Sequence, residues 1–240
     1  MQLIVNQKNK NMARKMGLVK KIIFGTIGTI ILFAVIVIVN LIIAGKYGSI
    51  ITKGQPIDNY IEHKSALLVI DIQEATTGNV SMYPFFKKNS DDLIKSINQI
   101  AESCSIQNIP VIYIRSEITN PLINLINNSY AKGHPGASND KRMKIVSDLE
   151  VVKKGKDSFR HTNLDSILTS NKVSELYIVG LDAAECVNAT VEAAQNRRYR
   201  VNLIDEAVLS KSQEMKDSMM ADFKNRGVRV INIDSLNIAN

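Results

Sequence analysis

The chain contains no tryptophan and only two cysteines, Cys104 and Cys186, among its 240 residues. Two cysteines cannot form a disulfide framework, and no CxxC or Cys/His spacing typical of a structural zinc site is present. Five prolines and twelve glycines, with 45% apolar and 22% charged residues, exclude a disordered or fibrous chain. The sequence therefore predicts a folded protein in which each thiol must be interpreted by itself.

Acidic residues are absent from the basic N-terminal tip, residues 1–21. This tip contains six Lys and Arg residues, which leaves 24 basic and 23 acidic residues in the rest of the chain. A nearly neutral body does not present the basic surface that binding to a phosphate backbone requires. We therefore expect no nucleic-acid partner.

Charged residues of either sign are absent from residues 22–44. Sixteen of these 23 residues are Ile, Leu, Val or Phe, and as a helix they would extend about 34 Å, enough to cross a bilayer. A buried core helix fits less well, because such apolar runs usually stop near 10 to 14 residues. A cleaved signal peptide is the stronger alternative, although the exit LIIAGKYG has no A-x-A-like cleavage site. We predict one uncleaved transmembrane helix in contact with membrane lipid.

The basic residues around this segment are unevenly distributed. Six of them precede Ile22, whereas only Lys46, Lys53 and Lys64 follow Ala44 over a comparable length. Cytoplasmic flanks are enriched in Lys and Arg, so this asymmetry predicts a cytoplasmic N-terminus and an extracytoplasmic domain. A free thiol outside the cell is more exposed to oxidation, which argues against this orientation.

Residues 45–64 are polar, without an apolar period, and are interpreted as a linker. Residues 65–240 match the size of one domain.

Six apolar runs rich in β-branched residues indicate buried parallel strands, at residues 66–71, 110–115, 149–154, 174–181, 199–205 and 228–233. Residues 91–107, 162–171, 184–197 and 212–225 carry apolar residues at helical spacing. This alternation predicts a three-layer α/β/α sandwich with a six-stranded, mostly parallel, doubly wound sheet. Residues 119–140 interrupt the pattern and are interpreted as a loop over the site.

Polar residues stand at strand ends, where such a fold forms its crevice. Asp71 ends the first apolar run; burial would suit it to proton transfer, and capping of the next turn is an equally good interpretation. Lys153 and Lys154 end the third run, and at most one can face the crevice because successive side chains alternate. Both can equally be a solvated strand end.

The two cysteines have different surroundings. Cys186 opens an amphipathic helix, where unpaired N–H groups and the helix dipole favour a thiolate. The alternative is a small apolar residue that packs the helix on the sheet. Cys104 shares the apolar face of a helix with Ile97 and Ile100 and is interpreted as structural.

Three segments together resemble the isochorismatase-like cysteine hydrolases, which include nicotinamidases and N-carbamoylsarcosine amidohydrolases. They are VIDIQ, VVKKGKDSFRHTNL and IVGLDAAECVNATVEAAQNRRYRVNLIDEAV. The resemblance covers residues 65–240 and implies a triad of Asp71, Lys153 and Cys186. Lys153 is preferred to Lys154 because the family's lysine usually lies six residues before a Phe, here Phe159.

The resemblance also implies a mechanism. Asp71 takes the proton of Cys186, the thiolate attacks a carbonyl carbon of a small amide, and the N–H groups of Asp182 and Cys186 form the oxyanion hole. The Leu181–Asp182 peptide bond corresponds to the family's cis bond. True isochorismatases lack the cysteine, so its presence favours cleavage of a C–N bond. The family commonly forms homodimers or homotetramers.

The chain departs from the family pattern at three places. Asp182 and Glu185 put two acids beside the thiol, where like charge opposes thiolate formation, and their spacing is also that of a capping box. Asp157-Ser158 replaces the family's Tyr-Ser or Ser-Ala pair. The family's metal site has no counterpart, because His63, His134 and His161 share no helical face or short spacing. We therefore expect no metal and no cofactor. The rival hypothesis is an inactive, membrane-tethered binding protein on the same fold.

Overall fold

The computed structural model describes residues 1–57 and 64–235, and for residues 2–11 it describes only the backbone. Residues 58–63 of the expected linker, including His63, and residues 236–240 of the expected domain lie outside the described residues. The chain divides into two units, residues 1–45 and residues 46–240. Each unit is described by itself.

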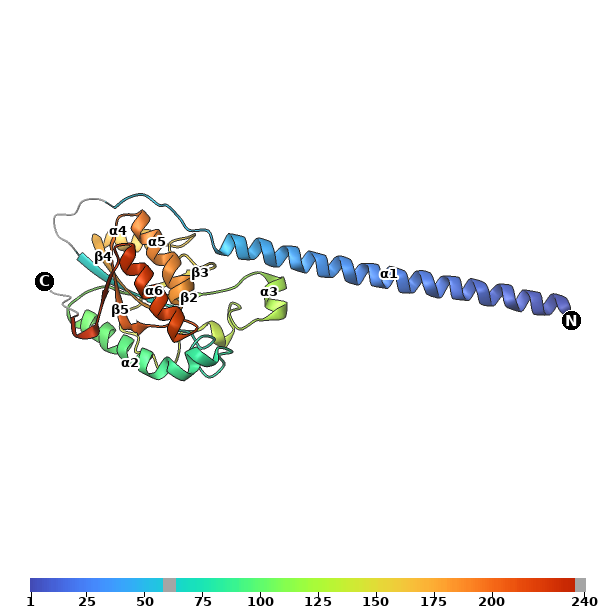
Figure 1. Ribbon diagram of the computed structural model, residues 1–240, viewed down its shortest axis with the longest axis horizontal. Coiled ribbons are helices and arrows are strands. Elements are labelled where there is room, and N and C mark those ends of the chain that lie inside the picture. Colours follow the sequence, from blue (N-terminus) through green and yellow to red (C-terminus); the bar gives the residue numbers. More distant parts are fainter. Residues whose placement is uncertain (58–63, 236–240) are drawn as a thin grey trace. The chain divides into compact units, whose positions relative to one another are not determined.

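The first unit is formed by helix α1, Gln2–Gly48, whose last three residues belong to the second unit (Figure 1). Its part Met12–Gly48 is long and apolar enough to cross a membrane, with a mean hydropathy of 3.0 in the most apolar window and none of that window buried. Phe24 and Ile30, for example, are exposed. This exposure rules out a buried core helix, whereas an anchor and a signal sequence share this composition.

The second unit is built on a six-stranded sheet in the order β3-β2-β1-β4-β5-β6. All of its strand pairs are parallel, which confirms the predicted fold class and makes the sheet fully rather than mostly parallel. The strands are β1 Lys64–Ile70, β2 Val111–Ser116, β3 Glu150–Lys153, β4 Val173–Gly180, β5 Arg200–Val208 and β6 Arg229–Ile231. The direction of winding reverses between β1 and β4, and such a switch point is where open α/β sheets bind ligands.

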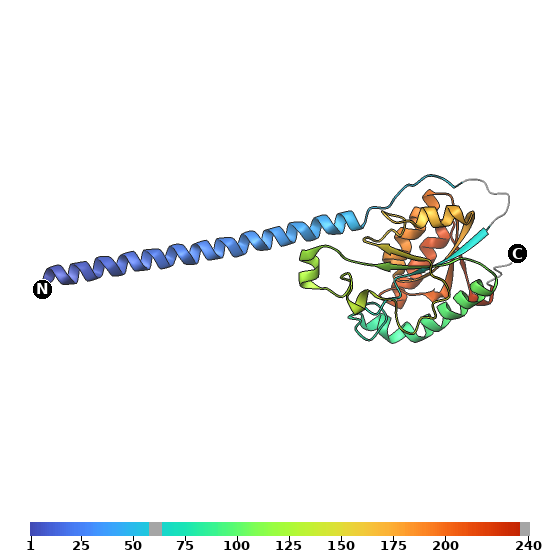
Figure 2. The same cartoon turned by 180° about the vertical axis from the view of Figure 1, so that it is seen from behind.

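Helices cover both faces of this sheet, as Figures 1 and 2 show. On one face the apolar residues of α2 pack on the strands, and on the other face those of α4, α5 and α6 do so. The helices are α2 Pro84–Ile106, α3 Pro121–Ile126, α4 Leu164–Ser170, α5 Asn188–Asn196 and α6 Gln213–Asn225. Because both faces are covered, the central strands are apolar on both sides, as in Ala66 to Ile70 of β1.

Several elements differ at their ends from the sequence-based expectation: α1 runs to Gly48, into the expected linker, and β5 runs to Val208. Two other segments differ more. Helix α2 begins at Pro84 rather than Asp91, since Pro84 occupies the first helical turn and Phe86 is buried in the core. The expected loop at residues 119–140 contains helix α3, whose N-cap Asn120 accepts hydrogen bonds from two backbone N–H groups, and a 3-10 turn, Pro135–Ala137. Local capping therefore orders a stretch whose composition suggested only a loop.

Gly180, the last residue of β4, lies very close to the end of β1. Its φ is +116°, and a Cβ there would lie 2.1 Å from the carbonyl oxygen of Ile70. Only glycine permits both this dihedral angle and this approach. The two central strands therefore converge at the sheet edge where polar residues follow them.

We predict that Gly180→Ala destabilises the domain by about 2–5 kcal/mol, because it adds backbone strain and a clash with β1. Gly133→Ala is the matched control, since Gly133 has a φ of +79° but no atom near the added Cβ. Only the conformational cost of about 1–2 kcal/mol applies there. Guanidinium unfolding of the full chain in detergent measures both values, and equal losses would contradict the packing argument.

Candidate active site

Asp71 directly follows β1 and is held in a constrained conformation. Its φ is +55°, a region that non-glycine residues seldom adopt. Its backbone N–H donates to Ile114 O at 2.8 Å, and its carbonyl oxygen accepts from Thr76 Oγ1 at 2.6 Å. These bonds turn the side chain of Asp71, which is 5% exposed, toward the ends of the neighbouring strands.

Lys153, the last residue of β3, brings the predicted residues together. Its Nζ lies 2.8 Å from Asp71 Oδ2 and 3.2 Å from Cys186 Sγ, although the three residues are far apart in the sequence. The Lys153 side chain is completely buried, whereas Lys154 is exposed. The alternation along the strand thus places Lys153, and not Lys154, beside Asp71 and the thiol.

Cys186 lies in a π-helical turn, Ala183–Val187, that precedes α5. Its carbonyl oxygen accepts a hydrogen bond from Thr190 Oγ1 at 2.8 Å, which fixes the turn to the helix. The residue is half-buried, whereas Cys104 is completely buried among the apolar residues of α2. This placement matches the structural role predicted for Cys104.

The electrostatics of the site favour a protonated thiol at rest. Burial, and then the charge of Asp71, raise the pKa of Cys186 to about 12, while Lys153 opposes this shift. Burial lowers the pKa of Lys153, but the anionic partners Asp71 and Cys186 outweigh it and raise that pKa overall. Burial and a neighbouring carboxylate therefore outweigh the helix N-terminus, which was expected to favour the thiolate.

A comparison with known proteins places this arrangement in a family. The family model described as the isochorismatase domain matches residues 65–235. The chain belongs to the isochorismatase family.

Several known proteins resemble the chain. It is 26% identical to the N-carbamoylsarcosine amidase of an Arthrobacter species over 192 residues, which cover 72% of the chain and 70% of the relative. The structure of N-carbamoylsarcosine amidase from Thermoplasma acidophilum has a TM-score of 0.61 at 24% identity, covering 72% and 98% of the two chains. A cysteine hydrolase from Pseudomonas syringae pv. phaseolicola has a TM-score of 0.64 at 17% identity, covering 76% and 96%. These structures establish the isochorismatase fold.

The Leu181–Asp182 peptide bond, expected to be cis by the resemblance to the isochorismatase family, is cis. It lies between the end of β4 and the π-helical turn that carries Cys186. Asp182 is the N-cap of that turn: its Oδ1 accepts from Ala184 N at 3.0 Å and from Ser210 Oγ at 2.5 Å. The predicted oxyanion-hole residues Asp182 and Cys186 thus belong to one short turn.

The two acids that depart from the family pattern do not form the expected capping box. Glu185 instead forms ion pairs with Lys156 and, at 3.0 Å, with Lys211. Burial raises the pKa of Glu185, but these two lysines outweigh it and lower that pKa overall. The negative charge of Glu185 is therefore compensated by lysines from other parts of the chain rather than by the backbone N–H groups of the turn that contains it.

Two further residues interact with the charged groups of the site and were missed in the sequence. Ser116 Oγ lies 3.0 Å from Asp71 Oδ1 and 2.8 Å from Lys153 Nζ, so it links the two charged groups. Tyr130 belongs to the segment expected to be a loop over the site, and burial together with Tyr83, Asp71 and Cys186 raises its pKa. Ser116 could have been identified from the sequence, because it lies at the end of a strand as the other site residues do. No pattern in the sequence marked Tyr130.

The two histidines of the described residues, His134 and His161, have different surroundings. His134 Nδ1 accepts a hydrogen bond from Gly136 N at 3.0 Å, and His161 is exposed. Within residues 1–57 and 64–235, no group of three His, Cys, Asp or Glu residues is arranged to hold a metal ion. We therefore assign no step of the chemistry to a metal.

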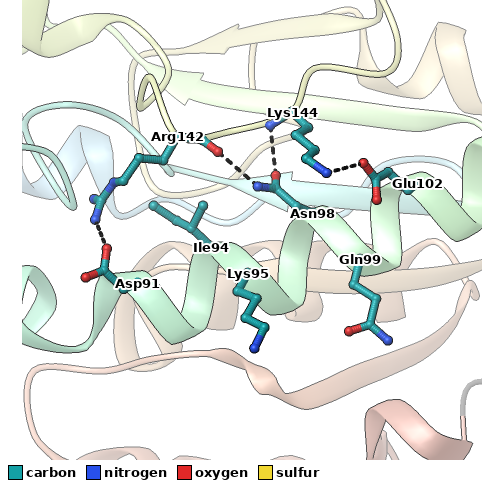
Figure 3. A pocket seen from close by; sticks show the side chains of 8 residues that line it. All are labelled: Asp91, Ile94, Lys95, Asn98, Gln99, Glu102, Arg142 and Lys144. Atoms are coloured by element: carbon teal, nitrogen blue, oxygen red, sulfur yellow. Dashed lines mark hydrogen bonds and ion pairs between the residues drawn. The ribbon is translucent and has the colours of Figure 1, made fainter.

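A surface hollow along α2 lies apart from these residues (Figure 3). Four of its charged side chains pair with one another: Arg142 pairs with Asp91, and Lys144 Nζ lies 2.6 Å from Glu102 Oε1. Asn98 bridges Arg142 O and Lys144 N. The lining residues are Asp91, Ile94, Lys95, Asn98, Gln99, Glu102, Arg142 and Lys144. This set contains no Cys, Ser or Thr, so the strand-end site is the better candidate.

The electrostatics give a prediction about thiol reactivity. Iodoacetamide should alkylate Cys186 slowly at neutral pH, with a rate that rises about tenfold per pH unit up to pH 10 because the thiolate is the reacting species. Asp71→Asn should accelerate this alkylation and Lys153→Met should slow it, since Asp71 raises and Lys153 lowers the pKa of Cys186. Mass spectrometry of the labelled peptides measures the rates. A plateau below pH 9 in the unmodified chain would contradict the raised pKa.

Proposed function

We propose that the chain is a cysteine amidohydrolase that cleaves a C–N bond, in an amide or carbamoyl group, of a small molecule. The observation that carries this proposal is the contact of the buried Lys153 ammonium with both Asp71 and Cys186. A nucleophile, a base within reach of it and a cation that stabilises anions are the groups that acyl transfer needs. The amidase relatives in the family support the same reaction class.

The proposed reaction begins from the thiol form of Cys186. Asp71 accepts the thiol proton as the sulfur attacks the carbonyl carbon, and Lys153 stabilises the anionic groups during this transfer. The N–H groups of Asp182 and Cys186 stabilise the oxyanion of the tetrahedral intermediate. The protonated Asp71 returns the proton to the nitrogen, and ammonia or an amine leaves. Water then hydrolyses the thioester, with Asp71 as the base.

The competing proposal of an inactive binding protein depended on the acids near the thiol. Glu185 is paired with two lysines and Asp182 Oδ1 accepts from Ser210, so both acids have partners other than the thiol. The groups that shift the pKa of Cys186 are instead burial, Asp71 and Lys153. The arrangement therefore favours the enzyme over the inactive protein.

The experiment that tests the proposed function is release of ammonia from a panel of small primary amides and N-carbamoyl compounds. Cys186→Ala should abolish turnover with little change in melting temperature, because the substitution removes only the sulfur of a half-buried residue. Lys153→Ala should lower kcat/KM at least 100-fold, whereas Lys154→Ala, its exposed neighbour, should change it less than threefold. Retained hydrolysis in Cys186→Ala would remove the nucleophile assignment.

We further propose that the chain is anchored in a membrane by residues 22–44, with residues 1–21 in the cytoplasm and residues 65–240 outside it. The exposed apolar surface of α1 supports an anchor, since such surface is stable only in lipid or against a partner. The six basic residues before this segment, against three after it, support the orientation.

Protease treatment of intact cells or spheroplasts tests the orientation. We expect the domain to be digested without permeabilisation of the membrane, while the N-terminal tip stays protected. Survival of the domain until detergent is added would invert the orientation. Release of the domain into the medium without the helix would instead identify residues 22–44 as a cleaved signal.

A further inference from the structure

The segment that follows the apolar helix is bound to a loop beside the candidate site. Thr52 donates to Asp157 Oδ2 through both its backbone N–H, at 2.8 Å, and its hydroxyl, at 2.7 Å. Asp157 is almost completely buried, at 1% exposure. A carboxylate buried to this degree requires such partners, and charge-assisted hydrogen bonds of this kind are the strong ones.

The same segment contacts this loop at a second point. The carbonyl oxygen of Gly48 accepts from Lys156 N at 2.8 Å, and a Cβ at Gly155 would lie 2.9 Å from that oxygen. Asp157 Oδ1 accepts from Phe159 N at 2.8 Å, which ties the loop to the core residue Phe159. Residues 48–52 therefore hold the loop formed by residues 154–157 by its backbone and by its one buried carboxylate.

This loop continues directly from β3 and touches the buried lysine. The carbonyl oxygen of Gly155 lies 3.2 Å from Lys153 Nζ. It is one of four groups around the ammonium, with Asp71 Oδ2, Ser116 Oγ and Cys186 Sγ. A shift of the loop therefore moves one acceptor of the ammonium and changes how closely Nζ approaches the thiol.

We propose that Thr52 is a positioning residue for Lys153, acting through Asp157 and the loop of residues 154–157. The role of Lys153 in catalysis rests on the proposed function, but its position relative to the thiol does not. Asp157 is also one of the departures from the family pattern, and its partner Thr52 lies before the family domain, which begins at residue 65. The carboxylate that departs from the family pattern, Asp157, is thus the hydrogen-bond acceptor of a residue that lies before the family domain, Thr52.

The proposal makes a prediction about the thiol that needs no substrate. Lys153 lowers the pKa of Cys186, so a displaced ammonium raises that pKa and reduces the thiolate present at any pH. Thr52→Val removes the hydroxyl and keeps the volume of the side chain. Asp157→Asn is a second variant, because its amide has one acceptor oxygen and cannot accept from both Thr52 and Phe159 N, as the two carboxylate oxygens do.

The experiment is iodoacetamide labelling of the full chain in detergent between pH 7 and pH 10, followed by mass spectrometry. We expect both variants to label Cys186 about 3- to 10-fold more slowly than the unmodified chain at every pH, which corresponds to a pKa raised by about half a unit to one unit. Thr169→Val is the matched control, since Thr169 is exposed on α4, and it should label at the unmodified rate.

Cys104 reports on the fold in the same samples, because it is completely buried and labels only when the domain opens. Unchanged labelling of Cys186 in Thr52→Val would overturn the proposal. A change accompanied by rapid labelling of Cys104 would also overturn it, since it would show general destabilisation. Failure of the chain to release ammonia from any amide would refute the proposed function alone, because the labelling rates still decide the role of Thr52.

Discussion

The buried ammonium of Lys153 is the interaction on which the candidate site depends. A charge without solvent contact is tolerated only where partners compensate it, and here a carboxylate and a hydroxyl lie within 2.8 Å of the nitrogen. These partners come from the ends of β1 and β2, while the lysine ends β3. The parallel order of the strands puts all three ends at one edge. The compensation of the Lys153 charge therefore depends on this arrangement of the strands.

The same charged groups determine the protonation state of the Cys186 thiol. A helix N-terminus stabilises an anion by about 0.3–1 kcal/mol, whereas burial beside the carboxylate of Asp71 acts in the opposite direction and raises the pKa of Cys186. The resting site therefore holds a thiol, a carboxylate and an ammonium. In the proposed reaction the proton moves from sulfur to carboxylate only as the substrate is attacked. Cys186 therefore stays an unreactive thiol in the absence of substrate.

Acidic residues that look unfavourable in the sequence have specific partners in the fold. Asp182 caps the turn before Cys186 and accepts from Ser210, Glu185 lies between two lysines, and Asp157 binds Thr52. In each case the partner comes from another part of the chain. An acid near a nucleophile is therefore no evidence of lost activity until its partners are known.

The sequence by itself determined the order of strands and helices, the apolar N-terminal segment, and the candidates Asp71, Lys153 and Cys186. Apolar periodicity records which faces are buried, and polar residues at strand ends mark one edge of a parallel sheet. Only the tertiary structure decided that Lys153 rather than Lys154 reaches the thiol, that burial raises the pKa of Cys186, and that Thr52 binds Asp157 across 105 positions. Desolvation and long-range contacts depend on what surrounds a group in space, and a linear pattern does not contain that information.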